Sequence, residues 1–171
     1  MPSVDGREAN RRQERAARPN VWPWPPIILC ACAVIAIAAE HLFPTSAIWP
    51  ASPTLRIAGA VAMLAGLGFD VTAMTTMWRH NANILPHRAA TALVTTGPFA
   101  LSRNPIYLGN TMLLAGAGFA FANAWLLLAA LASAWLVSLL AIRREEAHLA
   151  IRFGDAWQIY AQRTPRWLRL W

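Results

Sequence analysis

The sequence predicts an all-α polytopic membrane protein with about four transmembrane helices. The last two should form a tight hairpin, followed by a C-terminal interfacial helix. Of the 171 residues, 57% are hydrophobic and 13% are charged, which is too apolar a balance for an ordinary soluble domain. The hydrophobic residues gather in four runs, at residues 26–43, 55–78, 105–122 and 124–142. Each run is long enough to cross a hydrocarbon core of about 30 Å.

The first element is a polar N-terminal segment. Residues 1–24 are rich in arginine, which predicts a flexible tail, and the membrane domain then takes residues 25–171. The first apolar run follows directly. A signal peptide is the alternative interpretation of that run, because "AIAAE" near its end offers a cleavage-like site. The long preceding tail and the spanning length of the run favour a membrane helix.

The arginines predict the orientation of the four spans. All 15 basic residues are arginine, and the net charge is +7. Fourteen of them lie in the tail, in the polar segment 79–104 and after residue 142, whereas segments 44–54 and 121–123 have none. Arg56, at the start of the second run, is the exception. The positive-inside rule places both termini in the cytoplasm, and we expect a bacterial inner membrane. Arginines beside apolar runs fit membrane lipids better than nucleic acid, so no nucleic-acid partner is expected.

The third run begins with a helix start signal. Pro105 suits the first helical position and Asn104 suits the N-cap, because each residue type is favoured there. One interpretation is a well-capped helix and nothing more. The other adds that the free N–H groups and partial positive charge of a helix N-terminus bind anions.

Two carboxylates, Glu145 and Glu146, lie just beyond the end of the fourth run. One interpretation is a solvated charge cluster with Arg143 and Arg144. In the other, the hairpin brings its two open ends together, so Glu145 lies near the helix that starts after Asn104. An anion site beside a carboxylate then suits a zwitterionic or cationic cofactor.

An amphipathic helix should follow the fourth run. Apolar side chains recur at helical spacing, and the opposite face is charged. This pattern predicts a helix that continues out of the membrane, bends to lie along its surface and stops before Pro165. The residues of the apolar face are Ile142, Leu149, Phe153, Trp157 and Tyr160.

The remaining candidates carry weaker patterns. Asp70 lies inside the second span, where an ionisable side chain is usually functional or paired, here with Arg79 or by snorkelling. Cys30 and Cys32 point in different directions on a helix, so no disulfide is expected. The histidines have no metal-ligand spacing, so we expect no metal site.

Two segments together resemble a known family. "TALVTTGPFALSRNPIYLGN" and "RREEAHLAIRFGDAWQIYAQRTPRW", separated by an apolar stretch, are similar to the isoprenylcysteine carboxyl methyltransferase family. That family belongs with the membrane phospholipid N-methyltransferases. The resemblance covers about residues 77–167. It implies an integral membrane enzyme that uses S-adenosylmethionine, held at the cytoplasmic ends of the last spans.

The resemblance also assigns residues. Gly66 and Gly68 look similar to a Gly-x-Gly of the phospholipid enzymes, although a glycine pair in a span is more often a packing site. The residues that would bind the cofactor are Leu93, Val94, Phe99, Asn104, Pro105, Ile106, Tyr107, Glu145 and Glu146.

The chain departs from the prenylcysteine enzymes at two positions. It has Asn104 where they have histidine, and Ala141 where they have an arginine that contacts the substrate. Arg143 or Arg144 could replace that arginine. We expect these two and Arg103 to converge on the site and to position an anionic acceptor.

The expected function is methyl transfer from S-adenosylmethionine to a lipidic acceptor that enters from the bilayer. The acceptor group should be a carboxylate, of a prenylcysteine-like or other lipid, because the arginines favour an anion. Two alternatives remain open. One is a phospholipid or other amine N-methyltransferase, and the other is a non-catalytic membrane module that retains the scaffold.

Overall fold

The computed structural model describes residues 24–45, 52–82 and 91–168. The regular elements of these residues are all helical, so the all-α prediction is confirmed. The predicted N-terminal tail lies outside the described residues as far as residue 23, and its flexibility stays a prediction. The elements are α2 (Trp24–Leu42), α3 (Pro53–Arg79), η1 (Gly97–Ala100), α4 (Pro105–Phe121), α5 (Ala124–Val137), the π-helical η2 (Ser138–Ile142) and α6 (Arg143–Arg163).

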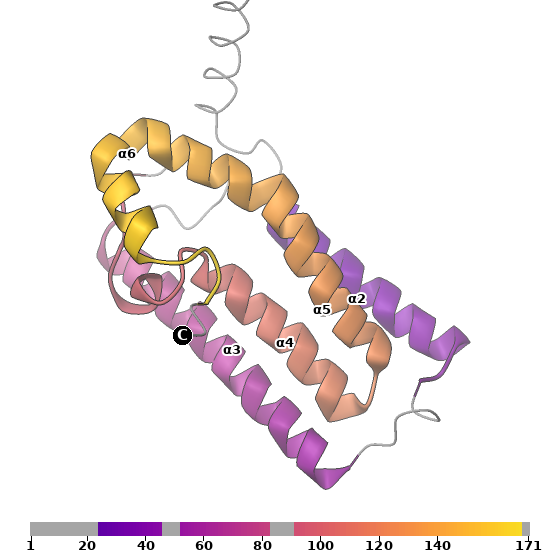
Figure 1. Cartoon of the computed structure of the whole chain (residues 1–171). Helices are drawn as coiled ribbons and strands as arrows, with labels where there is room; N and C mark the ends of the chain where they lie inside the picture. Colours follow the sequence, from indigo (N-terminus) through magenta and orange to yellow (C-terminus); the bar gives the residue numbers. More distant parts are fainter. Residues whose placement is uncertain (1–23, 46–51, 83–90, 169–171) are drawn as a thin grey trace, which may run out of the picture.

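The four long helices run up and down beside one another (Figure 1). Helix α4 packs between α3 and α5, and α2 packs against the other side of α5. One end of the bundle collects the start of α2, the end of α3, the start of α4 and the end of α5. Loop η1 and the bent end of α6 lie at this same end, so the polar segments are gathered there.

The helices present apolar side chains outward. Leu64 on α3 and Leu131 on α5 are each 69% exposed, as expected for side chains that face lipid. Among the described residues, three helices are long and apolar enough to cross a membrane: α2, α3 and the continuous helix that starts as α5. Helix α4 is apolar but shorter, with 17 residues. The protein is therefore a helical membrane protein, and the count of four spans stays a prediction.

Small residues bring α3 and α4 close together. A Cβ added to Gly66 would lie 2.6 Å from the carbonyl oxygen of Gly109, and one added to Gly116 would lie 2.7 Å from that of Gly59. Such contacts leave no room for any side chain at these positions. Gly66 is thus a packing residue, whereas a Cβ on Gly68 would meet nothing within 4 Å.

Asp70 lies on the same seam. Its side chain packs against Gly109, the residue is 8% exposed, and its Oδ1 has no hydrogen-bond partner among the described residues. The predicted pairing with Arg79 is not among the ion pairs of those residues. Gly109 is about 200° around α4 from Tyr107, so Asp70 lies on the far side of that helix from the site described below.

The predicted tight hairpin is confirmed. Helix α4 ends at Phe121, Ala122 takes a left-handed conformation with φ 51°, and α5 starts two residues later. Asn123 caps α5, because its side chain accepts a hydrogen bond from the Leu126 N–H at 3.0 Å. The open ends of α4 and of the α5–α6 helix therefore lie at the same end of the bundle.

The C-terminal helix already turns where α5 passes into α6, and it bends more sharply further along α6 (Figure 1). Helix α5 passes through η2 into α6 without a break. The sharper bend lies at Gly154, whose φ of 50° and ψ of −124° are not helical (Figure 1). Beyond this kink Trp157 and Tyr160 are buried, as their place on the apolar face predicted, and α6 ends at Arg163, before Pro165.

Candidate active site

The first turn of α4 meets the start of α6. The Tyr107 hydroxyl donates a hydrogen bond to the Glu145 carboxylate, with 2.7 Å between Oη and Oε1. The two residues are 38 apart in sequence and are joined only because the hairpin returns α5 alongside α4. The predicted neighbourhood of Tyr107 and Glu145 is therefore what the structure shows.

The N-terminus of α4 departs from the prediction in one respect. Pro105 stands in the first turn as expected, and Asn104 stands at the N-cap. However, the Asn104 side chain does not cap the helix, so that part of the prediction is wrong. Its Nδ2 donates instead to the carbonyl oxygen of Arg166 at 3.0 Å. No side chain caps the first turn of α4, so the N–H groups at this positive end of the helix dipole have no side-chain acceptor among the described residues.

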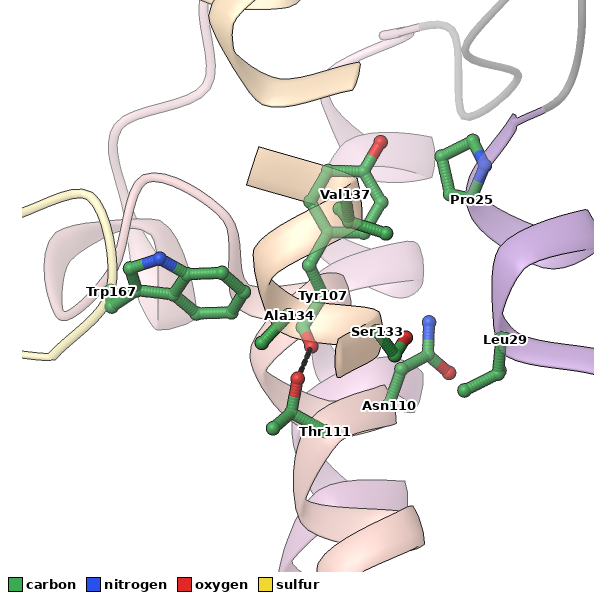
Figure 2. Close-up of a pocket in the computed structure, with 9 residues that line it drawn as sticks. All are labelled: Pro25, Leu29, Tyr107, Asn110, Thr111, Ser133, Ala134, Val137 and Trp167. Atoms are coloured by element: carbon green, nitrogen blue, oxygen red, sulfur yellow. Dashed lines mark hydrogen bonds between the residues drawn. The ribbon is translucent and has the colours of Figure 1, made fainter. Parts of the chain in front are cut away.

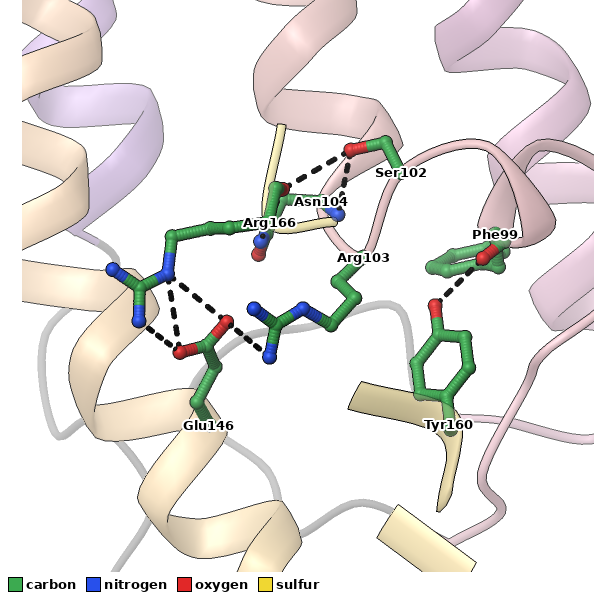
Figure 3. Close-up of polar contacts among 7 residues, drawn as sticks. All are labelled: Phe99, Ser102, Arg103, Asn104, Glu146, Tyr160 and Arg166. Atoms are coloured by element: carbon green, nitrogen blue, oxygen red, sulfur yellow. Dashed lines mark hydrogen bonds and ion pairs between the residues drawn. The ribbon is translucent and has the colours of Figure 1, made fainter. Parts of the chain in front are cut away.

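A short C-terminal segment crosses the start of α4. We name residues 164–167 the C-terminal strap. The Arg103 N–H donates to the Pro165 carbonyl oxygen at 2.9 Å, and the Ser102 hydroxyl donates to that of Arg166 at 3.2 Å. The polar loop before α4 thus binds backbone carbonyl oxygens of the strap, and Figure 3 shows the hydrogen bond from Ser102. Sequence reasoning missed this contact, since its partners are more than 60 residues apart.

The Glu146 side chain binds both the strap and the loop before α4. Its carboxylate pairs with the guanidinium of Arg103, at 3.1 Å, and with that of Arg166 through both oxygens (Figure 3). The hydrogen bonds from Arg166 to this carboxylate raise the pKa of the guanidinium. Arg103 also lies over the Trp157 ring, 5.6 Å from its centroid. Glu146 therefore pairs with two cations, whereas the hydrogen bond from Tyr107 to Glu145 comes from a neutral hydroxyl.

The surroundings of Glu145 change its titration. It follows the apolar run by three residues and is half-buried. Burial raises the pKa of the Glu145 carboxyl to about 6; the negative charge of Glu146 adds to the rise, and the hydrogen bond from Tyr107 opposes it. The carboxyl is consequently ionised at neutral pH but close to the range in which it takes up a proton.

The three arginines expected to position an acceptor have different environments. Arg103 is directed to Glu146 and Trp157, and its side chain is only 15% exposed. Arg143 and Arg144 are exposed on the first turn of α6, immediately before Glu145. Two of the three thus lie at the rim of the site, and their role toward an acceptor stays a prediction.

The segment before α4 is attached to the end of α6. The Tyr160 hydroxyl donates to the Phe99 carbonyl oxygen at 2.7 Å, so η1 is fixed to the kinked end of α6 (Figure 3). Val94 is buried and Leu93 is half-buried just before η1. The cofactor contacts expected of these residues and of Ile106 stay predictions.

Comparison with known proteins identifies the family. The model of the phospholipid methyltransferase family matches residues 54–156, well over half of the chain. The chain belongs to this family of membrane methyltransferases, which is related to the isoprenylcysteine carboxyl methyltransferases. The family implies methyl transfer and hence a methyl donor.

The chain also matches an individual protein over part of its length. The chain is similar to the nickel-cobalt-cadmium resistance protein NccN of Alcaligenes xylosoxydans xylosoxydans, with 34% identity over 109 residues. The match covers 64% of this chain and 50% of the relative, so the chain spans about half the length of that protein. No solved structure matches the chain.

Within the described ranges, no three potential metal-ligating side chains group together.

The residues at the start of α4 fit a methyl donor that carries both charges of an amino acid. The uncapped first turn of α4 suits a carboxylate, and Glu145 offers an anion to an ammonium or sulfonium. Both features lie within one turn of Tyr107, so they can act on one molecule.

Proposed function

We propose that the protein transfers a methyl group from S-adenosylmethionine to a lipidic acceptor at the cytoplasmic membrane surface. The observation that carries this proposal is the Tyr107–Glu145 pair beside the uncapped start of α4. A non-catalytic module would have no need of a half-buried carboxylate held at this position, because burying an ion is costly.

Tyr107 and Glu145 have different roles in the proposed reaction. Glu145 attracts the donor's ammonium, and Tyr107 holds the carboxylate in place by its hydrogen bond. The N–H groups in the first turn of α4 receive the donor's carboxylate. S-adenosylmethionine supplies a methyl group on a sulfonium, which is a good leaving group. The chain's contribution is then mainly to orient donor and acceptor for in-line transfer.

A carboxylate is the first candidate for the acceptor group. It needs no base, since it attacks as an anion and no proton has to leave. Arg143 and Arg144 are exposed beside Glu145 and can attract it. A prenylcysteine head is less well supported than other lipidic carboxylates, because Ala141 is 0% exposed and leaves no room for the family's arginine there.

A phospholipid amine is the second candidate, and the pairing of Arg103 favours it. The arginine cluster that would repel an ammonium head is smaller than the sequence suggested, because Glu146 neutralises Arg103. The matched family also takes its name from phospholipid methylation. An amine acceptor must lose a proton before or during transfer, so its turnover should rise with pH.

Two measurements test the proposal on the purified full chain in detergent. Calorimetric titration with S-adenosylmethionine should show binding, and Glu145→Gln should weaken it; no binding by the wild-type protein would favour the non-catalytic module. Turnover of labelled donor is then compared for a prenylated thioether carboxylic acid, an N-acyl amino acid and phosphatidylethanolamine. Activity on the amine lipid alone would overturn the carboxylate assignment and leave the donor site standing.

A further inference from the structure

The C-terminal strap is attached to both helices that supply the proposed donor site. The Ser102 hydroxyl and the Asn104 amide, just before α4, both donate to the Arg166 carbonyl oxygen, at 3.2 and 3.0 Å. The guanidinium of Arg166 binds the Glu146 carboxylate on α6, and Glu146 directly follows Glu145. The last residue of the strap is therefore held at a fixed place beside the site.

That last residue, Trp167, packs against the same apolar cluster as Tyr107. The buried members of this cluster are Ile28, Val137, Ala141 and Ile142. The two aromatic residues also line one small cavity between α2, α4 and α5, and Figure 2 shows the Trp167 indole directed from the strap toward α4. Trp167 is thus part of the apolar surroundings in which the Tyr107 ring lies.

The position of the Tyr107 ring decides where its hydroxyl lies. That hydroxyl donates to Glu145 Oε1 at 2.7 Å, and a hydrogen bond weakens steeply when its distance or angle changes. A tyrosine ring turns about two side-chain torsions, so the groups packed around it select its orientation. Removing the indole would leave a cavity that the neighbouring helices fill only in part, and the phenol could then move away from Glu145.

We propose that Trp167 is a positioning residue of the donor site. Its indole supports the apolar cluster that fixes the Tyr107 ring, the phenol stays aligned with Glu145, and the aligned carboxylate binds the donor's ammonium. The hydrogen bonds to the strap carbonyl oxygens keep Trp167 in place even without the Arg166–Glu146 ion pair. The connection to donor binding rests on the proposed function.

The test compares donor affinity among variants of the full chain in detergent, by calorimetric titration with S-adenosylmethionine. Trp167→Ala should weaken binding about tenfold, the lower end of the range for a hydrogen bond to a charged group. Trp167→Phe retains a ring at this place and should restore most of the affinity. Leu168→Ala is the matched control, because this adjacent side chain is 40% exposed. Unchanged affinity in Trp167→Ala, or an equal loss in Leu168→Ala, would overturn the assignment.

A double-mutant cycle with Tyr107→Phe tests whether Trp167 acts through the Tyr107 hydroxyl. Tyr107→Phe removes that hydroxyl and should by itself weaken donor binding about tenfold. If Trp167 acts through the hydroxyl, the double variant should lose little more affinity than either single variant. Independent effects would instead multiply to about a hundredfold and would refute the positioning role. Trp167→Leu takes the place of Trp167→Ala in this cycle if the alanine variant does not fold.

The melting temperatures of the same four proteins, followed by circular dichroism, give a second cycle that needs no donor. Because Trp167 and Tyr107 pack against one cluster, their effects on stability should not add. If the wild-type protein does not bind S-adenosylmethionine, the proposed function fails, and additive melting effects would then overturn the support of Tyr107 by Trp167 as well. If the donor binds but the losses of affinity multiply, the proposed function stands and the positioning role fails.

Discussion

Replacing the two adjacent glutamates one at a time should have two different effects. Glu145→Gln keeps the shape of the side chain and leaves an oxygen to accept the Tyr107 hydrogen bond, so it removes only the charge. Glu146→Gln removes the charge that pairs with Arg103 and Arg166. The two residues are neighbours in sequence but point about 100° apart on the helix, so each is the other's control.

The magnitudes follow from what each carboxylate contacts. A charge-assisted hydrogen bond contributes about 1.5–3 kcal/mol, so Glu145→Gln should weaken S-adenosylmethionine binding by about 10- to 150-fold. Glu146 is 13% exposed and Arg103 is 15% exposed, so its loss leaves a largely buried guanidinium without its anion. Glu146→Gln should therefore lower the free energy of unfolding by about 1–3 kcal/mol, with a smaller effect on donor affinity.

Both effects can be measured on the same preparations. Calorimetric titration with the donor gives affinity, and tryptophan fluorescence on heating gives stability in the same detergent. The expected pattern is a loss of affinity in Glu145→Gln with nearly unchanged thermal stability, and the reverse in Glu146→Gln. Equal losses of affinity in the two variants, or a change below twofold in Glu145→Gln, would contradict the separate roles.

Three further outcomes are expected. Gly66→Ala should destabilise the protein by about 1–3 kcal/mol, because the added Cβ would lie 2.6 Å from the Gly109 carbonyl oxygen, whereas Gly68→Ala should not; similar melting temperatures for both would refute this. Donor affinity should fall about fourfold from pH 7.5 to pH 5.5, because the raised pKa of about 6 lets Glu145 take up a proton and lose its attraction for an ammonium, and Glu145→Gln should show no such dependence on pH. Reporter fusions at residue 50 and at the C-terminus should report opposite sides of the membrane, and the same side for both would exclude four spans.

The features that the sequence predicted well depend on neighbours along the chain. The helical runs follow from length and hydropathy, and the hairpin follows from the very short connection between two such runs. The approach of Tyr107 to Glu145 then follows from the hairpin alone, because each lies near the open end of its helix. No long-range information was needed for these steps.

The features that the sequence did not predict depend on contacts between distant segments. The favoured N-cap residue type at Asn104 predicted a side-chain cap, but the C-terminal strap offers the amide a carbonyl oxygen 62 residues away. Local preference is a weak guide when a distant partner competes for the same group. The kink at Gly154 was also missed, although a glycine inside an amphipathic helix is the one local signal that could have indicated it.

The strap gives the two adjacent glutamates different partners. Glu146 holds the C-terminal strap over the start of α4 through Arg103 and Arg166, and its charge offsets that of Arg103. Without Glu146, the largely buried guanidinium of Arg103 would lose its anionic partner. The polar residues before α4 therefore act mainly as the attachment of the strap. The anion binding proposed for the helix start depends on its backbone N–H groups, which no side chain caps.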